Sequence, residues 1–228
     1  MDGTVVIFFH SRTVFLTFFD LTLCFCCVVV LLCCCVVVVL WCCGVVVLWC
    51  CCCGIVVLSC CCVVVSPPRH HSSTVVATKA ALKLSDYVVT EGGFGADLGA
   101  EKFFDIKCRK TGLKPSVAVV VATCRALKLH GGADEKTLST VENVPALKKG
   151  ICNLAKHVEN VQKFGVPAMV AINVFPTDTE AEIEATQQAC EAMGVKAVRS
   201  DHHNDGGDGA LDFAQEVVDL IDANPNGK

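Results

Sequence analysis

Three side chains that could hold an anion lie close together near the middle of the chain. Arg125, Lys128 and His130 follow one another closely and are followed directly by Gly131 and Gly132. Taken singly, each of these residues is more often part of a solvated surface. Clustered, their donors can hold a phosphate or a carboxylate. The cluster is therefore the first candidate for anion chemistry.

A glycine-rich segment at 91–99 is a second candidate. Its polar and glycine residues include Glu91, Gly93, Gly95 and Asp97, with Phe94 between the glycines. Glycine permits positive φ and lets a ligand approach the backbone closely. The spacing is not a dinucleotide fingerprint, because Leu98 stands where the third glycine belongs and Gly99 comes one residue late. A ligand-binding loop and an ordinary tight turn both remain open.

A third segment places an aromatic side chain on a loop. Phe175 and Pro176 follow an apolar run and precede Asp178. An exposed aromatic residue is costly to solvate unless something packs on it, so the pair indicates a binding surface. The same stretch also fits a capping box for the next helix, formed either by Thr177 with Glu180 or by Thr179 with Glu182.

The polar segment 200–207 contains two adjacent histidines, His202 and His203, beside acidic residues. This set could bind a metal ion. Neighbours in sequence seldom point at one ion, however, so an ordinary polar loop is the favoured reading and we expect no metal site.

Apolar strands that alternate with amphipathic helices must position these segments. Uninterrupted β-branched runs at Ser116–Val121 and Val166–Asn173 predict strands buried on both faces. Shorter strands are expected at 87–90 and 196–199, and helices at 74–84, 100–108, 144–164, 180–193 and 209–222. The pattern predicts an α/β fold, with a parallel sheet and helices on both faces. Because ligands bind beyond the carboxyl ends of such strands, the segments 91–99, 122–132, 173–179 and 200–207 should converge.

Residues 1–65 differ in kind from the rest. From Leu21 to Val65, every residue except Thr22, Ile55 and Ser59 is Val, Cys, Leu, Trp, Gly or Phe. Codons built only from G and T encode these six amino acids, so a translated G/T-rich DNA tract is the favoured reading. A membrane segment within residues 14–65 is the alternative, since about 20 apolar residues cross a bilayer. Clustered cysteines acting in redox or metal chemistry are the third reading.

Residues 66–228 have the composition of an ordinary globular domain, and the pair Pro67-Pro68 marks a plausible boundary. They carry 18 basic and 21 acidic side chains. This balance provides no basic surface for nucleic acid. Their four scattered cysteines, Cys108, Cys124, Cys152 and Cys190, fit a reduced cytoplasmic protein.

Four stretches resemble the formate–tetrahydrofolate ligase family. The run V-A-T-C-R-A-L-K-L-H-G-G at 121–132 is similar to the family signature, with Cys124 where Ile or Val is usual. The stretch 90–109, which begins T-E-G-G-F-G-A-D, is similar to a second family block, with Gly92 in place of Ala. A-I-N-V-F-P-T-D-T at 171–179 and the L-K-K-G to F-G-V-P run at 147–167 also match. The likeness covers about residues 70–224 and implies an incomplete fold of the P-loop-NTPase type.

The resemblance implies a reaction and a set of roles. Family members couple ATP, formate and tetrahydrofolate through formyl phosphate with Mg²⁺, and they form homo-oligomers. The resemblance also allows for a monovalent cation. Arg125 would then be the catalytic candidate that stabilises an anion. The pterin ring would pack on Phe94, Phe175 and Pro176, with His203 where the family has Trp. The resemblance also suggests a nucleotide or substrate loop built from Glu91, Gly93, Gly95, Asp97, Lys128 and Asp178.

One family feature is missing from the sequence. The chain contains no G-x-x-x-x-G-K-S/T motif, whose lysine and hydroxyl would hold the ATP phosphates and Mg²⁺. We therefore expect a fragment of a longer enzyme that does not catalyse ATP-dependent formylation alone. A non-catalytic folate-binding or subunit-interaction module is the alternative, and a membrane-anchored family variant is a third possibility.

Overall fold

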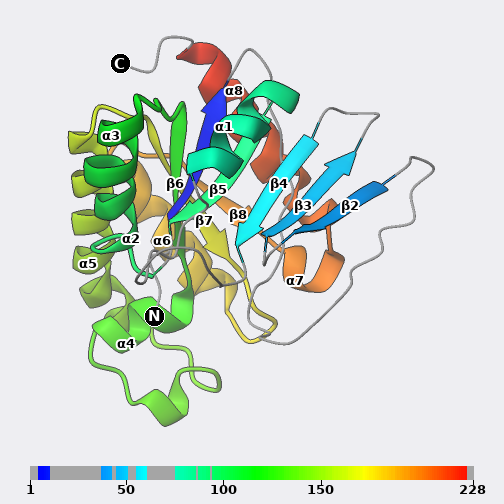
Figure 1. Ribbon diagram of the computed structural model, residues 1–228. Helices are drawn as coiled ribbons and strands as arrows, with labels where there is room; N and C mark the ends of the chain where they lie inside the picture. The colour runs from blue at the N-terminus through cyan, green and yellow to red at the C-terminus, as the bar shows by residue number, and fades with distance from the viewer. Residues whose placement is uncertain are drawn as a thin grey trace.

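The computed structural model describes residues 5–10, 37–42, 45–50, 55–60, 75–85, 87–92 and 94–224. The side chains of the first four of these ranges, and that of His203, lie outside the described part. Within these ranges the strands form one mixed sheet of eight strands in the order β2-β3-β4-β5-β1-β6-β7-β8 (Figure 1).

The half of the sheet that matters for the site is parallel. Strands β6 (Val117–Ala122), β7 (Ala168–Asn173) and β8 (Ala197–Ser200) pair in parallel. Strand β5 (Tyr87–Gly92) runs in the same direction but is separated from β6 by β1 (Val5–His10), which is antiparallel to both. The predicted α/β fold with its parallel strands is thus confirmed, with the antiparallel strand β1 inserted between β5 and β6.

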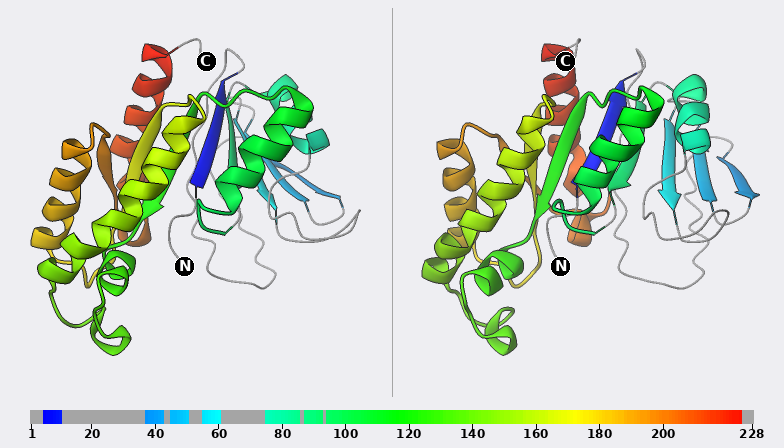
Figure 2. Two further views of the ribbon diagram at one scale, coloured as in Figure 1. Left: turned by 90° about the vertical axis from the view of Figure 1, so that its left-hand side faces the viewer. Right: turned by 60° about the vertical axis from the view of Figure 1, so that its left-hand side comes forward.

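Helices cover both faces of the sheet, as the sequence predicts. One core lies under α5 (Val144–Lys163) and α6 (Glu180–Ala192) and includes Val120, Leu154 and Ile183. The other lies under α8 (Leu211–Ala223) and includes Val119 and Phe213. Alternate residues of β6 point into opposite cores, which explains why this strand is apolar throughout. Figure 2 shows α5 and α8 on opposite sides of the sheet.

Local signals set the bounds of the longer helices. The Asn143 side chain accepts from the backbone N–H of Ala146 at the start of α5, and Gly165 follows its end with φ of 76°. The helix expected at 144–164 is amphipathic as predicted, with an apolar stripe in which Leu147, Leu154, Val158 and Val161 are buried and Ile151 is partly buried. For α6 the structure decides between the two capping boxes, because Thr179 and Glu182 form it reciprocally.

The helix expected at 100–108 has an unusual form. Here α2 (Gly99–Glu101), the π-helix η1 (Lys102–Cys108) and α3 (Arg109–Thr111) run on as one helical segment. The segment ends at Gly112, whose φ is 69°. α1 (Val75–Leu84) matches the helix expected before β5.

Two segments expected to be irregular form short helices. Residues Cys124–His130 are α4, with the Thr123 side chain accepting from the backbone N–H of Ala126 at 3.2 Å. Four residues of the expected polar loop at 200–207 are α7 (His202–Asp205), followed by the 3₁₀ turn η3 (Asp208–Ala210). In the first case the threonine cap outweighs the polar appearance of the run. The 3₁₀ turn η2 (Glu135–Thr137) lies between α4 and α5.

The apolar N-terminal segment contributes strands to the same sheet. β2 (Val37–Cys42), β3 (Val45–Cys50) and β4 (Ile55–Cys60) form an antiparallel meander, and β4 pairs with β5 in parallel. The rest of the suggested membrane segment at 14–65 lies outside the described residues. Among the residues that the structure describes, no helix is long and apolar enough to span a bilayer.

Candidate functional site

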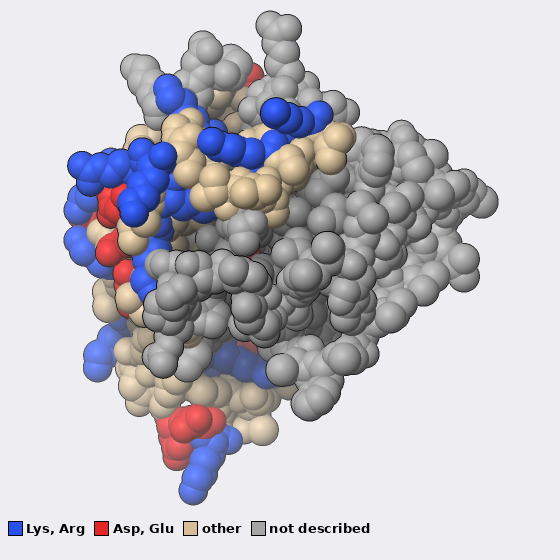
Figure 3. Space-filling model, in the orientation of Figure 1, with Lys and Arg blue, Asp and Glu red and all other residues tan. Residues whose placement is uncertain are grey.

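The candidate segments gather at one edge of the sheet. Because β5, β6, β7 and β8 run in the same direction, their carboxyl ends face the same way. Each strand leads there into one of the segments 91–99, 122–132, 173–179 and 200–207. Figure 3 shows that Lys and Arg side chains gather instead around α1 and α3, at the opposite end of the molecule from α4. The edge that carries the candidates is therefore not the most basic part of this face.

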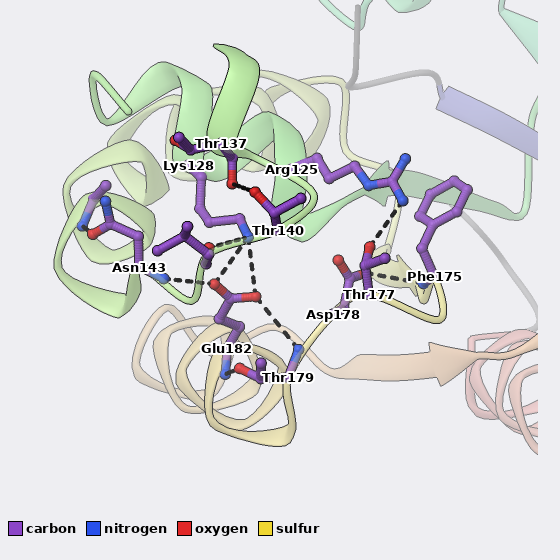
Figure 4. A network of polar contacts seen from close by, with 12 residues as sticks. Arg125, Lys128, Thr137, Thr140, Asn143, Phe175, Thr177, Asp178, Thr179 and Glu182 are labelled. Atoms are coloured by element: carbon purple, nitrogen blue, oxygen red, sulfur yellow. Dashed lines mark hydrogen bonds and ion pairs between the residues drawn. The ribbon is translucent and has the colours of Figure 1, made fainter. Parts of the chain in front are cut away.

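A direct contact between two of the candidate segments joins α4 to the loop after β7. The Arg125 guanidinium lies 4.4 Å from the centroid of the Phe175 ring. Its Nη2 also donates to Thr177 Oγ1 at 2.9 Å (Figure 4). A guanidinium stacked on an aromatic ring keeps its charge and its in-plane donors while the ring fixes its plane. Two residues predicted separately, one for an anion and one for an aromatic ligand, therefore form one unit.

Asp178 fixes the turn that carries Phe175. Its Oδ2 accepts a hydrogen bond from the backbone N–H of Phe175 at 2.9 Å. Burial raises the pKa of this carboxyl, although the Phe175 N–H and the charges of Arg125 and Lys128 act in the opposite direction. Asp178 Oδ1 and Arg125 Nε are buried without a hydrogen-bond partner among the described residues. The acceptor Oδ1 of Asp178 and the donor Nε of Arg125 are therefore both available to a ligand beside the stacked pair.

Lys128, predicted for a nucleotide or substrate loop, is held in a buried ion pair. Its Nζ lies 3.0 Å from Glu182 Oε1, and the two side chains are 1% and 0% exposed. Lys128 also donates to the Val141 carbonyl at 3.3 Å. In this structure the lysine is directed at α6 and the segment before α5, and not at the loop around Phe175.

The glycine-rich segment after β5 has a strained aromatic residue at its tip. Phe94 is 47% exposed and has a φ of 67°, the left-handed region that non-glycine residues rarely adopt. Such strain is typical of ligand-binding loops. Glu91 and Asp97 are exposed on the same segment, Gly95 is half-buried, and Gly93 lies outside the described residues.

The remaining predicted contacts are distributed along the same edge. Pro176 is exposed next to Phe175. His203 belongs to α7, but its side chain lies outside the described part. Its neighbour His202 has its Nδ1 2.9 Å from the Ser200 hydroxyl.

A small pocket lies between α4 and α5 beside the end of β6. Its polar lining consists of Thr123, His130, Asn153 and His157. His130 Nδ1 and Asn153 Nδ2 are 3.1 Å apart, and His157 Nδ1 is buried without a partner among the described residues. Burial lowers the pKa of His157 despite the opposing charge of Asp97. His157 is half-buried because α4 packs against this face of α5.

Two glycines, Gly131 at the end of the signature run and Gly150 on α5, allow α4 and α5 to pack closely. A Cβ at Gly131 would lie 1.8 Å from the Ala146 carbonyl oxygen, and one at Gly150 would lie 1.9 Å from that of Leu127. The backbones of α4 and α5 therefore approach each other more closely than side chains would allow. Gly132 has a φ of 89°, which also favours glycine.

The described residues do not fit the cofactors that the resemblance implies. Cys124, Asp178 and Glu182 bring ligand atoms within 4.8 Å of one another. Mg²⁺ prefers an octahedron of oxygen ligands, whereas burial raises the pKa of the Cys124 thiol to about 12 and Lys128 already neutralises Glu182. The P-loop that would hold ATP phosphates is absent from the sequence. The arrangement can hold an anion and an aromatic ring, but no phosphoryl transfer can be derived from it.

Several residues of this site were not predicted from the sequence. Thr177 and Glu182 entered only as helix caps, and Asn143 was not singled out. The capping pattern did identify Thr179 with Glu182, but it carried no sign that the carboxylate also reaches Lys128. A lysine four residues after a buried position such as Cys124 is the one signal that could have indicated a buried amine.

Comparison with known proteins shows which family this chain belongs to. Residues 69–228 match the family described as Formate--tetrahydrofolate ligase. A protein of that name from Granulibacter bethesdensis is 60% identical over 153 residues, which cover 67% of this chain and 27% of the relative. Another from Pelagibacter ubique is 57% identical over 155 residues, or 68% of this chain and 28% of the relative. The chain thus spans little more than a quarter of these relatives, and it belongs to the formate–tetrahydrofolate ligase family.

Proposed function

We propose that this chain provides the folate- and anion-binding part of a formate–tetrahydrofolate ligase, a cytoplasmic enzyme of one-carbon metabolism. The full reaction would join formate to tetrahydrofolate through formyl phosphate at the expense of ATP. The observation that carries the proposal is the stacked Arg125–Phe175 pair at the carboxyl ends of the strands. A ring for the flat pterin lies there beside a fixed positive charge for the acyl phosphate.

Each side chain would contribute a distinct interaction. Phe175, with Pro176 beside it, offers apolar surface for the pterin ring, and Phe94 on the loop after β5 would offer more. Arg125 offers donors in a plane set by Phe175 and Thr177, where negative charge develops as the formyl group transfers. A guanidinium held in place needs little reorganisation during reaction, so its stabilising effect is greatest for the charge that it already faces.

The chain on its own should not complete the reaction. ATP binding and Mg²⁺ would come from a P-loop, and the sequence contains none. The test is an assay of the purified chain with ATP, formate and tetrahydrofolate, alongside a full-length relative as positive control. We expect no 10-formyltetrahydrofolate above the level without protein. Measurable, ATP-dependent synthesis by this chain would refute the proposed division of roles.

A non-catalytic folate-binding module is the second candidate, because the aromatic surface does not depend on a P-loop. Calorimetric titration with tetrahydrofolate separates the outcomes. Heat of binding at sub-millimolar ligand, without formylation, supports a binding role for this chain. The absence of heat up to millimolar ligand would remove both the binding module and the folate-binding role of Phe175.

A further inference from the structure

We propose that Lys128 and Glu182 are positioning residues that hold Arg125 over Phe175. The purpose assigned to that stacked pair rests on the proposed function, whereas the link between the ion pair and the stack can be tested without any ligand. Figure 4 shows the two groups side by side, with Lys128 and Glu182 on one side and Arg125, Phe175, Thr177 and Asp178 on the other.

Glu182 is the centre of the buried network. Its Oε1 accepts from the backbone N–H of Asn143 at 2.9 Å and lies 3.0 Å from Lys128 Nζ. Its Oε2 lies 3.3 Å from the same amine and accepts from the backbone N–H of Thr179 at 3.4 Å. The carboxylate therefore binds three segments at once: α4, the residues before α5, and the start of α6.

The positions of these residues link the network to the stack. Lys128 lies one turn after Arg125 on α4. Holding the Lys128 amine against Glu182 therefore fixes the rotation of α4 about its axis and its distance from α6. Thr179 directly follows Asp178, whose carboxylate sets the turn that carries Phe175. The ion pair thus joins the element that carries the guanidinium to the element that carries the ring.

A surface ion pair could not do this. Exposed pairs such as that of Lys156 with Glu159 exchange with water and constrain the backbone weakly. Lys128 and Glu182 are both buried and fully partnered, so any shift of α4 relative to α6 would leave a charge unpaired in the interior. A charge pair with that cost restricts the two elements to one relative position.

The test removes both charges together, because a single substitution would leave the other charge buried. Lys128→Met with Glu182→Gln keeps similar volumes and an amide oxygen that can accept from Asn143. The readout is the Nε–H resonance of Arg125 in protein labelled with ¹⁵N-arginine, assigned by its loss in Arg125→Lys. In the unmutated protein this resonance should carry the ring-current shift of Phe175, and Phe175→Leu should abolish the shift.

The expected result is that the double variant, folded by circular dichroism, loses most of this shift and binds tetrahydrofolate about threefold to tenfold more weakly. Two controls should retain the shift: Lys128→Arg, which keeps the ion pair, and Lys156→Met with Glu159→Gln, which removes an exposed one. A folded double variant with an unchanged Arg125 resonance would overturn the proposal.

Three other outcomes are also decisive. If the double variant does not fold, Lys128→Met with Glu182→Met, which replaces both charges by apolar side chains, is the second test. An unchanged Arg125 resonance there would overturn the positioning role. If the unmutated protein shows no ring-current shift at Arg125, the stack does not form in solution and the proposal fails. Loss of the shift in a protein that binds no tetrahydrofolate would support positioning and refute the proposed function.

Discussion

The guanidinium of Arg125 lies 4.4 Å from the ring centroid of Phe175 and donates a hydrogen bond to Thr177. The two residues are 50 positions apart in sequence and meet because β6 and β7 are parallel neighbours. The stack therefore depends on the sheet, and it converts two separate surface residues into one preorganised group.

The stack should contribute measurably to stability. Arg125→Met keeps much of the aliphatic volume but removes the cation–π interaction and the hydrogen bond to Thr177. We expect the free energy of unfolding to fall by about 0.5 to 2 kcal/mol. Urea unfolding followed by circular dichroism measures the change. Lys136→Met, on an exposed lysine of η2, is the control and should be close to neutral. Equal effects of the two substitutions would contradict a specific role for the stack.

Gly150 should not tolerate a side chain. A Cβ there would lie 1.9 Å from the Leu127 carbonyl oxygen, so Gly150→Ala must push α4 away from α5. Overpacking of this kind costs about 1 to 3 kcal/mol. The matched control is Gly207→Ala, because Gly207 has a φ of −62° and open space at its Cβ. If thermal unfolding showed the two variants to be equally stable, the close approach of α4 and α5 would be wrong.

Asp178 should make stability depend on pH in a definite direction. Its pKa in the folded protein is raised above the ordinary value of 3.8, chiefly by burial. The folded state therefore keeps this proton to higher pH than the unfolded state, and the free energy of unfolding falls as pH rises between the two pKa values. Asp178→Asn keeps an acceptor for the Phe175 N–H and removes this fall.

Urea unfolding at several pH values from about 3.5 upward tests this sign. The stability of Asp178→Asn relative to the unmutated protein should increase as pH rises through the window and then level off. Asp105→Asn, at an exposed position of η1, corrects for the general effect of losing a carboxyl. A relative stability of Asp178→Asn that decreased with rising pH would show that the carboxyl is stabilised as an anion.

The described cysteines should differ in reactivity. Burial raises the pKa of Cys124 to about 12 and those of Cys108 and Cys190 to about 11, whereas Cys152 is exposed on α5. Because the thiolate is the reacting species, iodoacetamide should modify Cys152 first and Cys124 last. Peptide mass spectrometry at successive times measures the order. Early modification of Cys124 in folded protein would contradict the burial of its thiol at the start of α4.

Much of the fold could be predicted because the apolar pattern of each element agrees with the faces that it buries. The uninterrupted apolar run of β6 and the stripe on α5 require burial on two faces and on one face, and the structure provides both. α4 was not predicted, since its cap Thr123 follows a strand without a loop and its polar residues resemble a turn. α7 was missed because a four-residue helix carries no periodicity.

The candidate site was likewise predicted only in part. Residue types alone identified Arg125 for an anion and Phe175 for an aromatic surface. Sequence could not show that these two residues contact each other, because that contact depends on strand order. The burial of Lys128 could not be predicted either. A lysine on a polar segment is expected to be solvated, and only the fold shows that Glu182 on α6 pairs with it. Which residues bind a ligand and which position them is a tertiary property.

The central claim is that the surface of Phe175 beside Arg125 binds tetrahydrofolate. Its most direct test is calorimetric titration of tetrahydrofolate into the purified chain and into Phe175→Leu, with Phe164→Leu as a control at a partly buried phenylalanine away from this loop. We predict sub-millimolar binding by the unmutated chain, weakened about tenfold in Phe175→Leu and little changed in Phe164→Leu. Equal affinity of the unmutated chain and folded Phe175→Leu would contradict the account.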